Sequence, residues 1–123
     1  GARSGEIRSI SRDNLLEDSI IVRGKSGRRM VKLNAQAKDI IHNLDELWDY
    51  KKDYARHKFK KEVRRLGIKN ARLHDLRRTF GLNLIKQGMS IYKVSKLLGH
   101  NSVRTTEQHY APLLTSEIED FEL

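Results

Sequence analysis

The stretch SIYKVSKLLGHNSVRTTEQHYAP, residues 90–112, contains a helix, a stop and a second helix. Ser90 is a favourable N-cap, and apolar side chains recur at helical spacing until Gly99 ends the first helix. The spacing predicts a second helix from about Ser102 to Ala111, which Pro112 stops. The segment therefore favours a helical protein. Its predicted inward side chains are those of Ile91, Val94, Leu97 and Leu98.

Three further helices are predicted before this stretch. The first is capped by Asn34, the second runs from about Asp53 to Leu66 and ends at Gly67, and the third ends at Gly88. Each has one apolar stripe at the three- and four-residue spacing of a helix. The predicted inward side chains are Ile40, Ile41, Leu44, Leu47 and Trp48; Phe59, Val63 and Leu66; and Leu76, Phe80, Leu84 and Ile85.

The one convincing β signal lies nearer the amino terminus, in SIIVRGKSGRRMVKLN, residues 19–34. β-Branched residues precede a Gly24–Gly27 turn, after which residues 30–33 resume the strand pattern. This predicts a hairpin with a polar, basic tip, and a short extra strand near residues 14–15 also fits. We therefore expect an α+β, mainly α fold, with a small antiparallel sheet followed by about five helices in one domain.

Charge is the strongest feature of the composition. Lys and Arg number 25 against 16 Asp and Glu, giving a net charge of +9, although the last eleven residues carry four acids and no base. Such a balance indicates a polyanionic partner, most often nucleic acid. The sequence contains no cysteine, no signal-peptide pattern and no apolar run near the roughly 18 residues of a membrane helix. We expect an intracellular protein without disulfides.

Six polar side chains with phosphate chemistry stand where the predicted secondary structure changes or a helix begins. Taken singly, each has a structural explanation: Lys25 as a solvated turn residue, a histidine as a helix cap, and Tyr110 as a core aromatic. Together they form a set that could act on one phosphate. The six are Arg3, Lys25, His74, Arg77, His100 and Tyr110.

Breaking a DNA phosphodiester without a metal needs a nucleophile, two cations on the non-bridging oxygens and a proton donor for the leaving oxygen. A phosphotyrosine ester stays reactive, so the strand can be resealed without ATP, and arginine binds a phosphate through its planar fork. The sequence has no clustered carboxylates or histidines typical of Mg²⁺ or Zn²⁺ sites. We therefore expect no metal and no other cofactor.

Four segments resemble, in order, the successive motifs of the tyrosine recombinases, the phage-integrase family. They are GARSGEI (1–7), VRGKSGRRMVKL (22–33), HDLRRTF (74–80) and LLGHNSVRTTEQHY (97–110). A histidine and an arginine three residues apart would be weak evidence alone. The HDLRR motif followed 26 residues later by the histidine of LGH, and then by TTEQHY, is a specific combination that covers nearly the whole chain with its partners.

The resemblance implies roles for the six residues. Tyr110 would attack the scissile phosphate, leaving a 3′-phosphotyrosine link and a free 5′-hydroxyl. Arg3 and Arg77 would hold the non-bridging oxygens, and Lys25 would protonate the departing 5′ oxygen from a hairpin tip in the minor groove. His74 would take part in proton transfer with Tyr110, and His100 would hydrogen-bond the phosphate. Supporting roles are implied for Glu6 and Asp75, and DNA contacts for Arg28, Arg29, Arg78 and Arg104.

The resemblance also implies the organisation of the chain. Residues 1–123 would be the carboxy-terminal part of a recombinase catalytic domain, without the family's amino-terminal DNA-clamping domain. Residues 113–123, LLTSEIEDFEL, form an acidic, amphipathic tail that would dock in cis or on a neighbouring protomer of a tetramer on double-stranded DNA. A turn capped by Ser116 with Glu119 is predicted within it. The expected location is the cytoplasm, on DNA, in a prokaryotic or virus-infected cell.

Two other functions are compatible with parts of the sequence. Residues 90–110 also fit a helix-turn-helix of a non-catalytic DNA-binding module, whose second helix would face the major groove. Such a module would not explain Lys25 in its GKSG turn, the HDLRR motif or Tyr110. A structural RNA-binding protein would explain the basic body, but aromatic residues are only 7% and no aromatic–basic sheet motif is present. Site-specific recombination therefore explains more of the sequence than either alternative.

Overall fold

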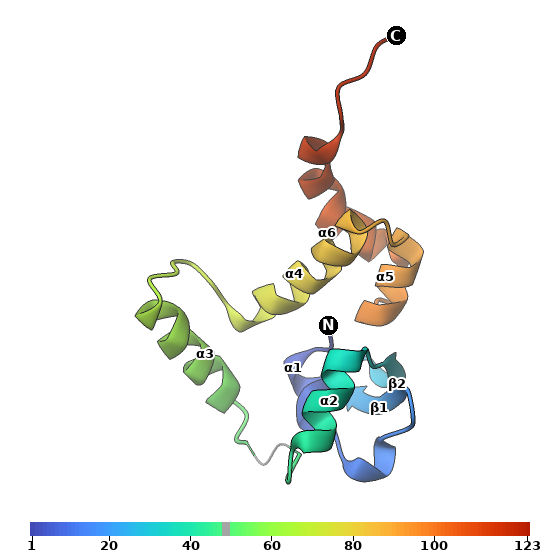
Figure 1. Cartoon of the computed structure of the whole chain (residues 1–123). Coiled ribbons are helices and arrows are strands. Elements are labelled where there is room, and N and C mark those ends of the chain that lie inside the picture. Colours follow the sequence, from blue (N-terminus) through green and yellow to red (C-terminus); the bar gives the residue numbers. More distant parts are fainter. Residues whose placement is uncertain (48–49) are drawn as a thin grey trace.

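The architecture is a β-hairpin flanked by short helices, joined through a basic helix to a three-helix unit (Figure 1). The computed structural model describes residues 1–47 and 50–123, apart from the side chain of Glu117. The helices in this part of the chain are α1 (Ser4–Arg8), α2 (Ala35–Asn43), α3 (Tyr54–Arg65), α4 (Leu73–Lys86), α5 (Ile91–Leu98) and α6 (Val103–Leu114). The strands are β1 (Ser19–Gly24) and β2 (Gly27–Lys32), and 3-10 turns occupy η1 (Arg12–Asn14) and η2 (Thr115–Glu117). The predicted fold class, a small antiparallel sheet followed by five helices, is confirmed.

The hairpin has the predicted turn. Gly24 pairs with Gly27, and Gly27 adopts a φ of +100°, which a residue with a Cβ rarely tolerates. Val22 lies opposite Arg29 in the antiparallel register. The strand expected near residues 14–15 is reduced to the single bridge Leu15–Ile20, following η1.

The first hydrophobic core, the hairpin core, forms where one face of the sheet meets α2. Its buried members are Ile20, Val22, Leu33 and Ile41. Asn34 caps α2 as predicted, through its side-chain oxygen and the Ala37 N–H. Ile40 was expected to face inward but is 58% exposed, because one helical position turns it by about 100° from the buried Ile41. Trp48, the last expected member of the stripe, lies outside the described residues.

The second core, the helical core, is built by α4, α5 and α6. Val94, Leu98 and Tyr110 are buried in it, with Phe80, Leu82, Leu84, Ile85 and Met89 packed around them. The inward face of α4 follows the series Arg77, Phe80, Gly81 and Leu84. Leu76 is one position off that face and is 56% exposed, so its predicted burial is wrong.

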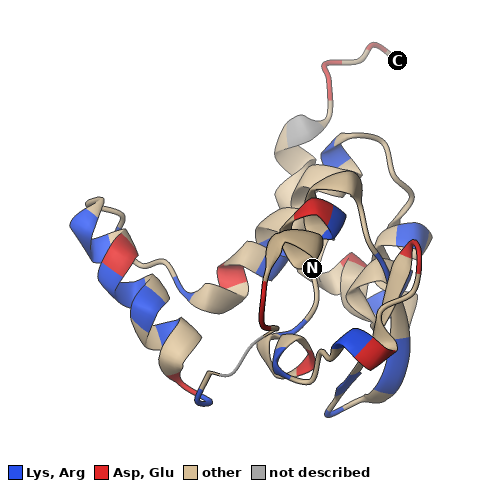
Figure 2. Cartoon of the chain, turned by 60° about the horizontal axis from the view of Figure 1, so that its bottom comes forward, with Lys and Arg blue, Asp and Glu red and all other residues tan. Residues whose placement is uncertain are grey.

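The basic helix α3 packs more loosely than predicted. Val63 is its buried residue, whereas Leu66, expected inward, lies at the helix end and is 61% exposed. Gly67 ends the helix with a φ of +72°, as the sequence indicated. Six of its twelve residues are Lys or Arg against a single acid, so α3 presents a cationic surface (Figure 2).

The chain beyond Ala111 departs from the prediction. Pro112 lies inside α6, which continues to Leu114, because proline has a helical φ and removes only one hydrogen bond near the helix end. The capped turn predicted from Ser116 to Glu119 is replaced by η2, in which the Ser116 hydroxyl donates to the Leu113 carbonyl. The segment after η2 runs away from the rest of the chain (Figure 1). Across the described residues, no helix is long and apolar enough to cross a membrane.

Candidate active site

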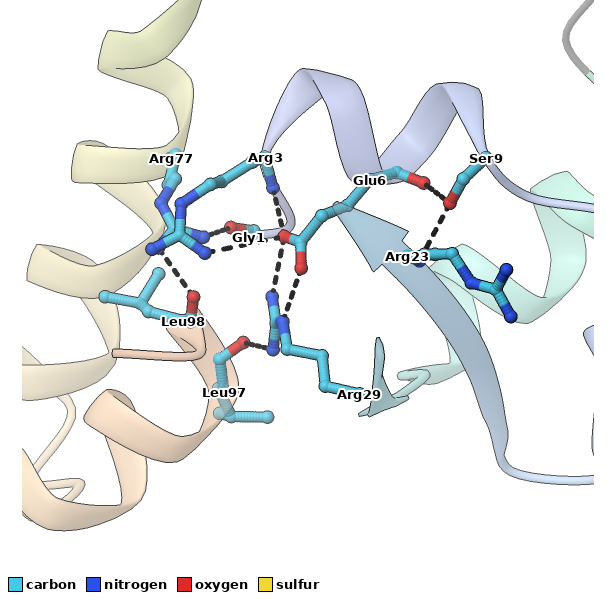
Figure 3. Close-up of polar contacts among 9 residues, drawn as sticks. All are labelled: Gly1, Arg3, Glu6, Ser9, Arg23, Arg29, Arg77, Leu97 and Leu98. Carbon is cyan, nitrogen blue, oxygen red and sulfur yellow. Dashed lines mark hydrogen bonds and ion pairs between the residues drawn. The ribbon is translucent and has the colours of Figure 1, made fainter. Parts of the chain in front are cut away.

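A cluster of charged and polar groups lies between the hairpin core and the helical core, and we call it the seam. Its members come from α1, β2, α4 and the α5–α6 connection: Arg3, Glu6, Arg29, Arg77 and His100 (Figure 3 shows the first four). These are polar residues where two apolar units meet, so each must be neutralised or hydrogen-bonded there. The seam also joins segments that are far apart in the sequence.

Arg77 is the most deeply embedded cation of the seam, with 7% of its surface exposed. Its Nη1 donates to the Gly1 carbonyl at 2.6 Å and its Nη2 to the Leu98 carbonyl at 2.5 Å. Burial lowers the pKa of Arg77 to about 10, assisted by the charges of Arg3 and Arg29, so the guanidinium is still protonated at neutral pH. A bound anion would relieve the repulsion among these three arginines.

Arg3 lies beside Arg77 at the start of α1 (Figure 3). Its backbone N–H donates to Glu6 Oε1 at 2.8 Å, and its Nη1 lies 3.9 Å from the same oxygen. That Nη1 is buried and has no hydrogen-bond acceptor among the described residues. Because a buried guanidinium nitrogen without an acceptor is costly, this donor is available for an oxygen of a bound anion.

Glu6 is the seam's one carboxylate and is 2% exposed. Arg29 binds it with both sides of its fork, Nε to Oε2 at 2.6 Å and Nη2 to Oε1 at 3.0 Å. Burial alone would raise the pKa of Glu6, but the hydrogen bonds from Arg29 and the Arg3 backbone outweigh it and lower the pKa below 4.5. The supporting role expected for Glu6 agrees with this geometry.

Arg29 has its hydrogen-bond partners within the protein. It was expected to contact DNA, yet its side chain is only 16% exposed and its Nη1 also donates to the Leu97 carbonyl at 2.9 Å. The strand alternates, so Arg28 is exposed while Arg29 points inward. The carboxylate and the carbonyl use the fork that a DNA phosphate would need, and Arg29 is therefore engaged within the protein.

His100 follows directly on the Gly99 stop of α5. Gly99 has a φ of +73°, and the amides of Gly99 and His100 return to Lys96 and Ser95, which closes the helix end. The His100 Nδ1 lies 2.6 Å from the hydroxyl of the fully buried Thr106. Burial, with the neighbouring Arg77 and Arg3, lowers the pKa of His100 to about 4, so the ring is neutral at pH 7. Thr106 was missed by the sequence analysis, which gave no signal for a histidine partner.

Tyr110 is 2% exposed, with its hydroxyl packed against the backbone of Gly81, where a Cβ would overlap it. Burial raises the pKa of Tyr110, and the charges of Arg77 and Arg78 act in the opposite direction. Gly81 is four residues beyond Arg77 on α4, a separation of about 6 Å along the helix. The hydroxyl therefore lies against α4, one helical turn along the backbone from Arg77.

The remaining predicted residues lie nearer the surface. His74 is exposed in the first turn of α4, and its pKa is lowered by partial burial and by Arg77 and Arg78. Asp75 accepts the Arg72 N–H at 2.8 Å and so caps that helix. Lys25 is exposed in the hairpin turn and has no hydrogen bond or ion pair to the seam within the described chain. Arg28, Arg78 and Arg104 are exposed as well.

The seam thus unites Arg3, Arg77 and His100. Tyr110 packs against Gly81 on the same helix as Arg77, and Lys25 stands apart on the hairpin. Three guanidiniums face a single carboxylate, which leaves an excess of positive charge beside an unsatisfied Arg3 donor. Such an arrangement is suited to holding an oxyanion. The residues that the sequence analysis missed here are Thr106, Gly81 and the carbonyl groups of Gly1, Leu97 and Leu98.

Comparison with known proteins identifies one family and several relatives that are similar to this chain. The model of the phage integrase family matches residues 1–117. Tyrosine recombinase XerA of Saccharolobus solfataricus is 33% identical over 129 residues, which cover 96% of this chain and 44% of XerA.

Solved structures share the fold. A crystal structure of XerA recombinase superposes with a TM-score of 0.71 at 20% identity, covering 98% of this chain and 53% of that one. XerH site-specific recombinase, bound to difH substrate in a pre-cleavage complex, gives a TM-score of 0.70 at 21% identity, covering 94% of this chain and 40% of XerH. The chain therefore spans about half the length of these relatives or less.

Proposed function

The chain belongs to the phage integrase family, and from this premise we propose that it carries out site-specific DNA recombination by cutting and rejoining strands through Tyr110. The observation that carries the proposal is the seam: Arg3 and Arg77 lie side by side, a neutral His100 is next to them, and Tyr110 packs against the helix that carries Arg77. The structural relatives include a recombinase bound to its DNA substrate, which supports DNA as the partner.

The proposed reaction is a transesterification at a phosphodiester. The Tyr110 oxygen forms a bond to phosphorus while the bond to the 5′ oxygen breaks, giving a 3′-phosphotyrosine and a 5′-hydroxyl. Arg3 and Arg77 neutralise the non-bridging oxygens as charge develops on them. The Tyr110 proton passes by way of His74, and Lys25 supplies the proton that the 5′ oxygen takes. Reversal by an incoming 5′-hydroxyl rejoins the strand, so the cycle needs neither ATP nor a metal.

His100 would donate one hydrogen bond to the phosphate. Since its pKa is about 4, the ring is neutral at the pH of the reaction and carries one N–H. If the Thr106 hydroxyl donates to Nδ1, the proton is on Nε2, which is then the donor toward the phosphate. We propose this tautomer because Thr106 is fully buried and has this acceptor at 2.6 Å.

Tyr110 must move before it attacks. Its hydroxyl is packed against Gly81 and the residue is 2% exposed, so a DNA phosphate cannot reach the hydroxyl in this conformation. The proposal therefore includes a displacement of the Tyr110 segment when DNA binds.

DNA would be bound mainly through charge. The exposed arginines Arg28, Arg78 and Arg104 are proposed phosphate contacts, and the cationic surface of α3 extends the basic area (Figure 2). The acidic tail, residues 113–123, is proposed to join protomers of a tetramer on DNA. Its apolar side chains support this, since Ile118 and Phe121 are 68% and 72% exposed and uncovered in the single chain.

Covalent trapping tests the proposal. The chain is incubated in EDTA with a pool of end-labelled, nicked duplexes of randomised sequence, and protein–DNA adducts are separated on a denaturing gel. We expect an adduct with the wild type that disappears in Tyr110→Phe. Tyr92→Phe is the matched control, because Tyr92 is a 62%-exposed tyrosine on α5 outside the seam, and it should give the adduct undiminished.

The other results exclude the mechanism. An adduct that survives Tyr110→Phe, or cleavage that needs added Mg²⁺, would show a different nucleophile or a metal-assisted reaction. Tight, salt-dependent DNA binding with no adduct would favour the non-catalytic helix-turn-helix module, in which α5 and α6 serve only to bind.

A further inference from the structure

Arg29 joins three segments of the chain that carry proposed reaction groups. Arg29 binds Glu6 of α1, the helix whose N-cap is Arg3. It also binds the Leu97 carbonyl at the end of α5, shortly before His100. Arg29 lies on β2, which begins at Gly27, and it is four residues after Lys25 in the sequence. One guanidinium on β2 therefore connects α1, through Glu6, with the end of α5, through Leu97 (Figure 3).

The backbone is shaped to admit this side chain. A Cβ at Gly99 would overlap the Arg29 guanidinium, and a Cβ at Gly24 would lie 2.8 Å from Glu6 Cγ. Gly24 is thus required by the Glu6 side chain, and Gly99 is required both by Arg29 and by its own left-handed turn. The Arg29–Glu6 pair is enclosed by backbone on two sides, which restricts it to one geometry.

The end of α5 is held by two arginines. Arg29 binds the Leu97 carbonyl and Arg77 binds the Leu98 carbonyl, and both are among the last carbonyls of the helix, which lack partners within it. Since Gly99 and His100 follow at once, the position of His100 depends on both bonds. Arg77 is also proposed to bind the DNA phosphate. Arg29 differs, because its fork is already used by Glu6 and by the Leu97 carbonyl.

We propose that Arg29 is a positioning residue of the recombination reaction, which fixes Arg3, the Lys25 hairpin and His100 relative to one another without touching DNA. This inference rests on the proposed function. A planar fork is needed because three acceptor oxygens surround it in different directions, and a lysine ammonium at the end of a flexible chain cannot match them at once. A misplacement of about 1 Å in such a constellation can cost about 100-fold in rate.

The experiment compares Arg29→Gln with two other variants of the same strand. Arg28→Gln removes a proposed phosphate contact, and Lys32→Gln removes an exposed cation far from the turn. DNA affinity is measured against salt concentration, and adduct formation is measured at saturating DNA. Backbone hydrogen exchange is followed at Gly99 and His100, whose amides donate within the end of α5.

We expect Arg29→Gln to bind DNA with the wild-type salt dependence but to form adduct about 100-fold more slowly at saturation. Exchange at Gly99 and His100 should become faster in it, and Lys32→Gln should match the wild type throughout. Arg28→Gln should weaken affinity and lower the salt slope by about 1. Arg29→Lys should remain slow, because the charge without the fork does not restore the geometry.

Loss of affinity in Arg29→Gln with a salt slope reduced as in Arg28→Gln would make Arg29 a DNA contact and overturn the proposal. So would wild-type adduct formation in Arg29→Gln or in Arg29→Lys. If Arg29→Gln fails to fold, Glu6→Gln/Arg29→Gln removes the unpaired buried carboxylate as well, and its adduct formation should still be slow. If the wild type itself forms no adduct, the proposed function fails and the positioning role in recombination fails with it. Hydrogen exchange at His100 then shows only whether Arg29 holds the end of α5.

Discussion

Glu6→Gln removes one charge from the centre of the seam and keeps the shape of the side chain. The carboxylate accepts three N–H groups, Arg29 Nε on Oε2 and both Arg29 Nη2 and the Arg3 amide on Oε1. Glutamine has a single oxygen, so its best orientation puts that oxygen at the Oε1 position and its NH₂ against Arg29 Nε. The variant loses one charge-assisted hydrogen bond and leaves the Arg29 charge without a counter-charge.

The expected cost is about 3 kcal/mol in the free energy of unfolding. A hydrogen bond to a charged group contributes about 1.5–3 kcal/mol, and removing one partner of a buried ion pair costs about 3–5 kcal/mol. We take the lower part of that range because the Arg29 side chain is 16% exposed. With a urea m-value of about 1.5 kcal/mol/M, the denaturation midpoint should fall by about 2 M.

Urea denaturation followed by far-UV circular dichroism measures this shift. Glu62→Gln is the control, because Glu62 pairs with Arg65 at 3.0 Å, but the two side chains are 40% and 66% exposed. That surface pair should be worth about 0.5 kcal/mol or less. A Glu6→Gln shift no larger than that of Glu62→Gln would refute the view that the Glu6–Arg29 pair holds the seam together.

The same pair gives a pH dependence. The folded pKa of Glu6 lies below its ordinary value of 4.5, so the folded state binds the proton less readily than the unfolded state. The stabilisation is complete above pH 4.5 and is lost as the pH falls through the folded pKa. The stability difference between the wild type and Glu6→Gln should therefore be constant near neutrality and shrink below pH 4.5. A difference that grows on acidification would contradict the assigned direction.

The remaining predictions concern the reaction. Arg77→Ala should slow adduct formation at saturating DNA by about 100- to 1,000-fold, as expected for a lost donor to a developing oxyanion; single-turnover trapping measures it, and a change below tenfold would exclude a phosphate-binding role. Lys25→Ala should cleave poorly but recover on a duplex whose 5′ bridging oxygen is replaced by sulfur, because a thiolate leaves without a proton; failure to recover would remove Lys25 as the acid. Thr106→Val should reduce stability by about 1 kcal/mol and slow trapping, whereas Thr106→Ser, which keeps the hydroxyl, should retain both; equal rates in the two would dissociate Thr106 from His100.

Local sequence signals predicted the elements well, because their causes are local. Ser90, Asn34 and the stop glycines act within a turn of themselves, and the GKSG turn determines the hairpin. Burial was predicted less well. The spacing of Ile40, Leu66 and Leu76 fits an apolar helix face, yet all three are exposed. The spacing does not show how much of that face the neighbouring element covers. The short helices here bury narrow faces, so the flanking positions remain exposed.

The six site residues could be proposed from the sequence because they lie in motifs that resemble those of a known family. The groups to which they are hydrogen-bonded in the folded chain could not be predicted in this way. Arg28 and Arg29 are adjacent arginines, and the sequence alone does not distinguish them. In the structure the side chain of Arg28 is exposed, whereas that of Arg29 points inward and binds Glu6. The partners of Arg29 are distant in the sequence: the Glu6 carboxylate is 23 residues before it and the Leu97 carbonyl is 68 residues after it.

Placing the reaction groups between two cores has a mechanical consequence. Arg77 and Tyr110 come from the helical core, and Arg3 and Lys25 come from the segments around the hairpin core. Two of the described hydrogen bonds cross the seam, from Arg29 to the Leu97 carbonyl and from Arg77 to the Gly1 carbonyl. A phosphate that takes the Arg77 donors would weaken the bond to Gly1, which crosses the seam, and the bond to Leu98, which holds the end of α5. The bond from Arg29 to Leu97 would then be the remaining one of the two across the seam. In the proposed reaction, substrate binding would therefore loosen the segment that carries His100 and Tyr110, and Arg29 would hold the hairpin against the end of α5 while Tyr110 moves away from Gly81.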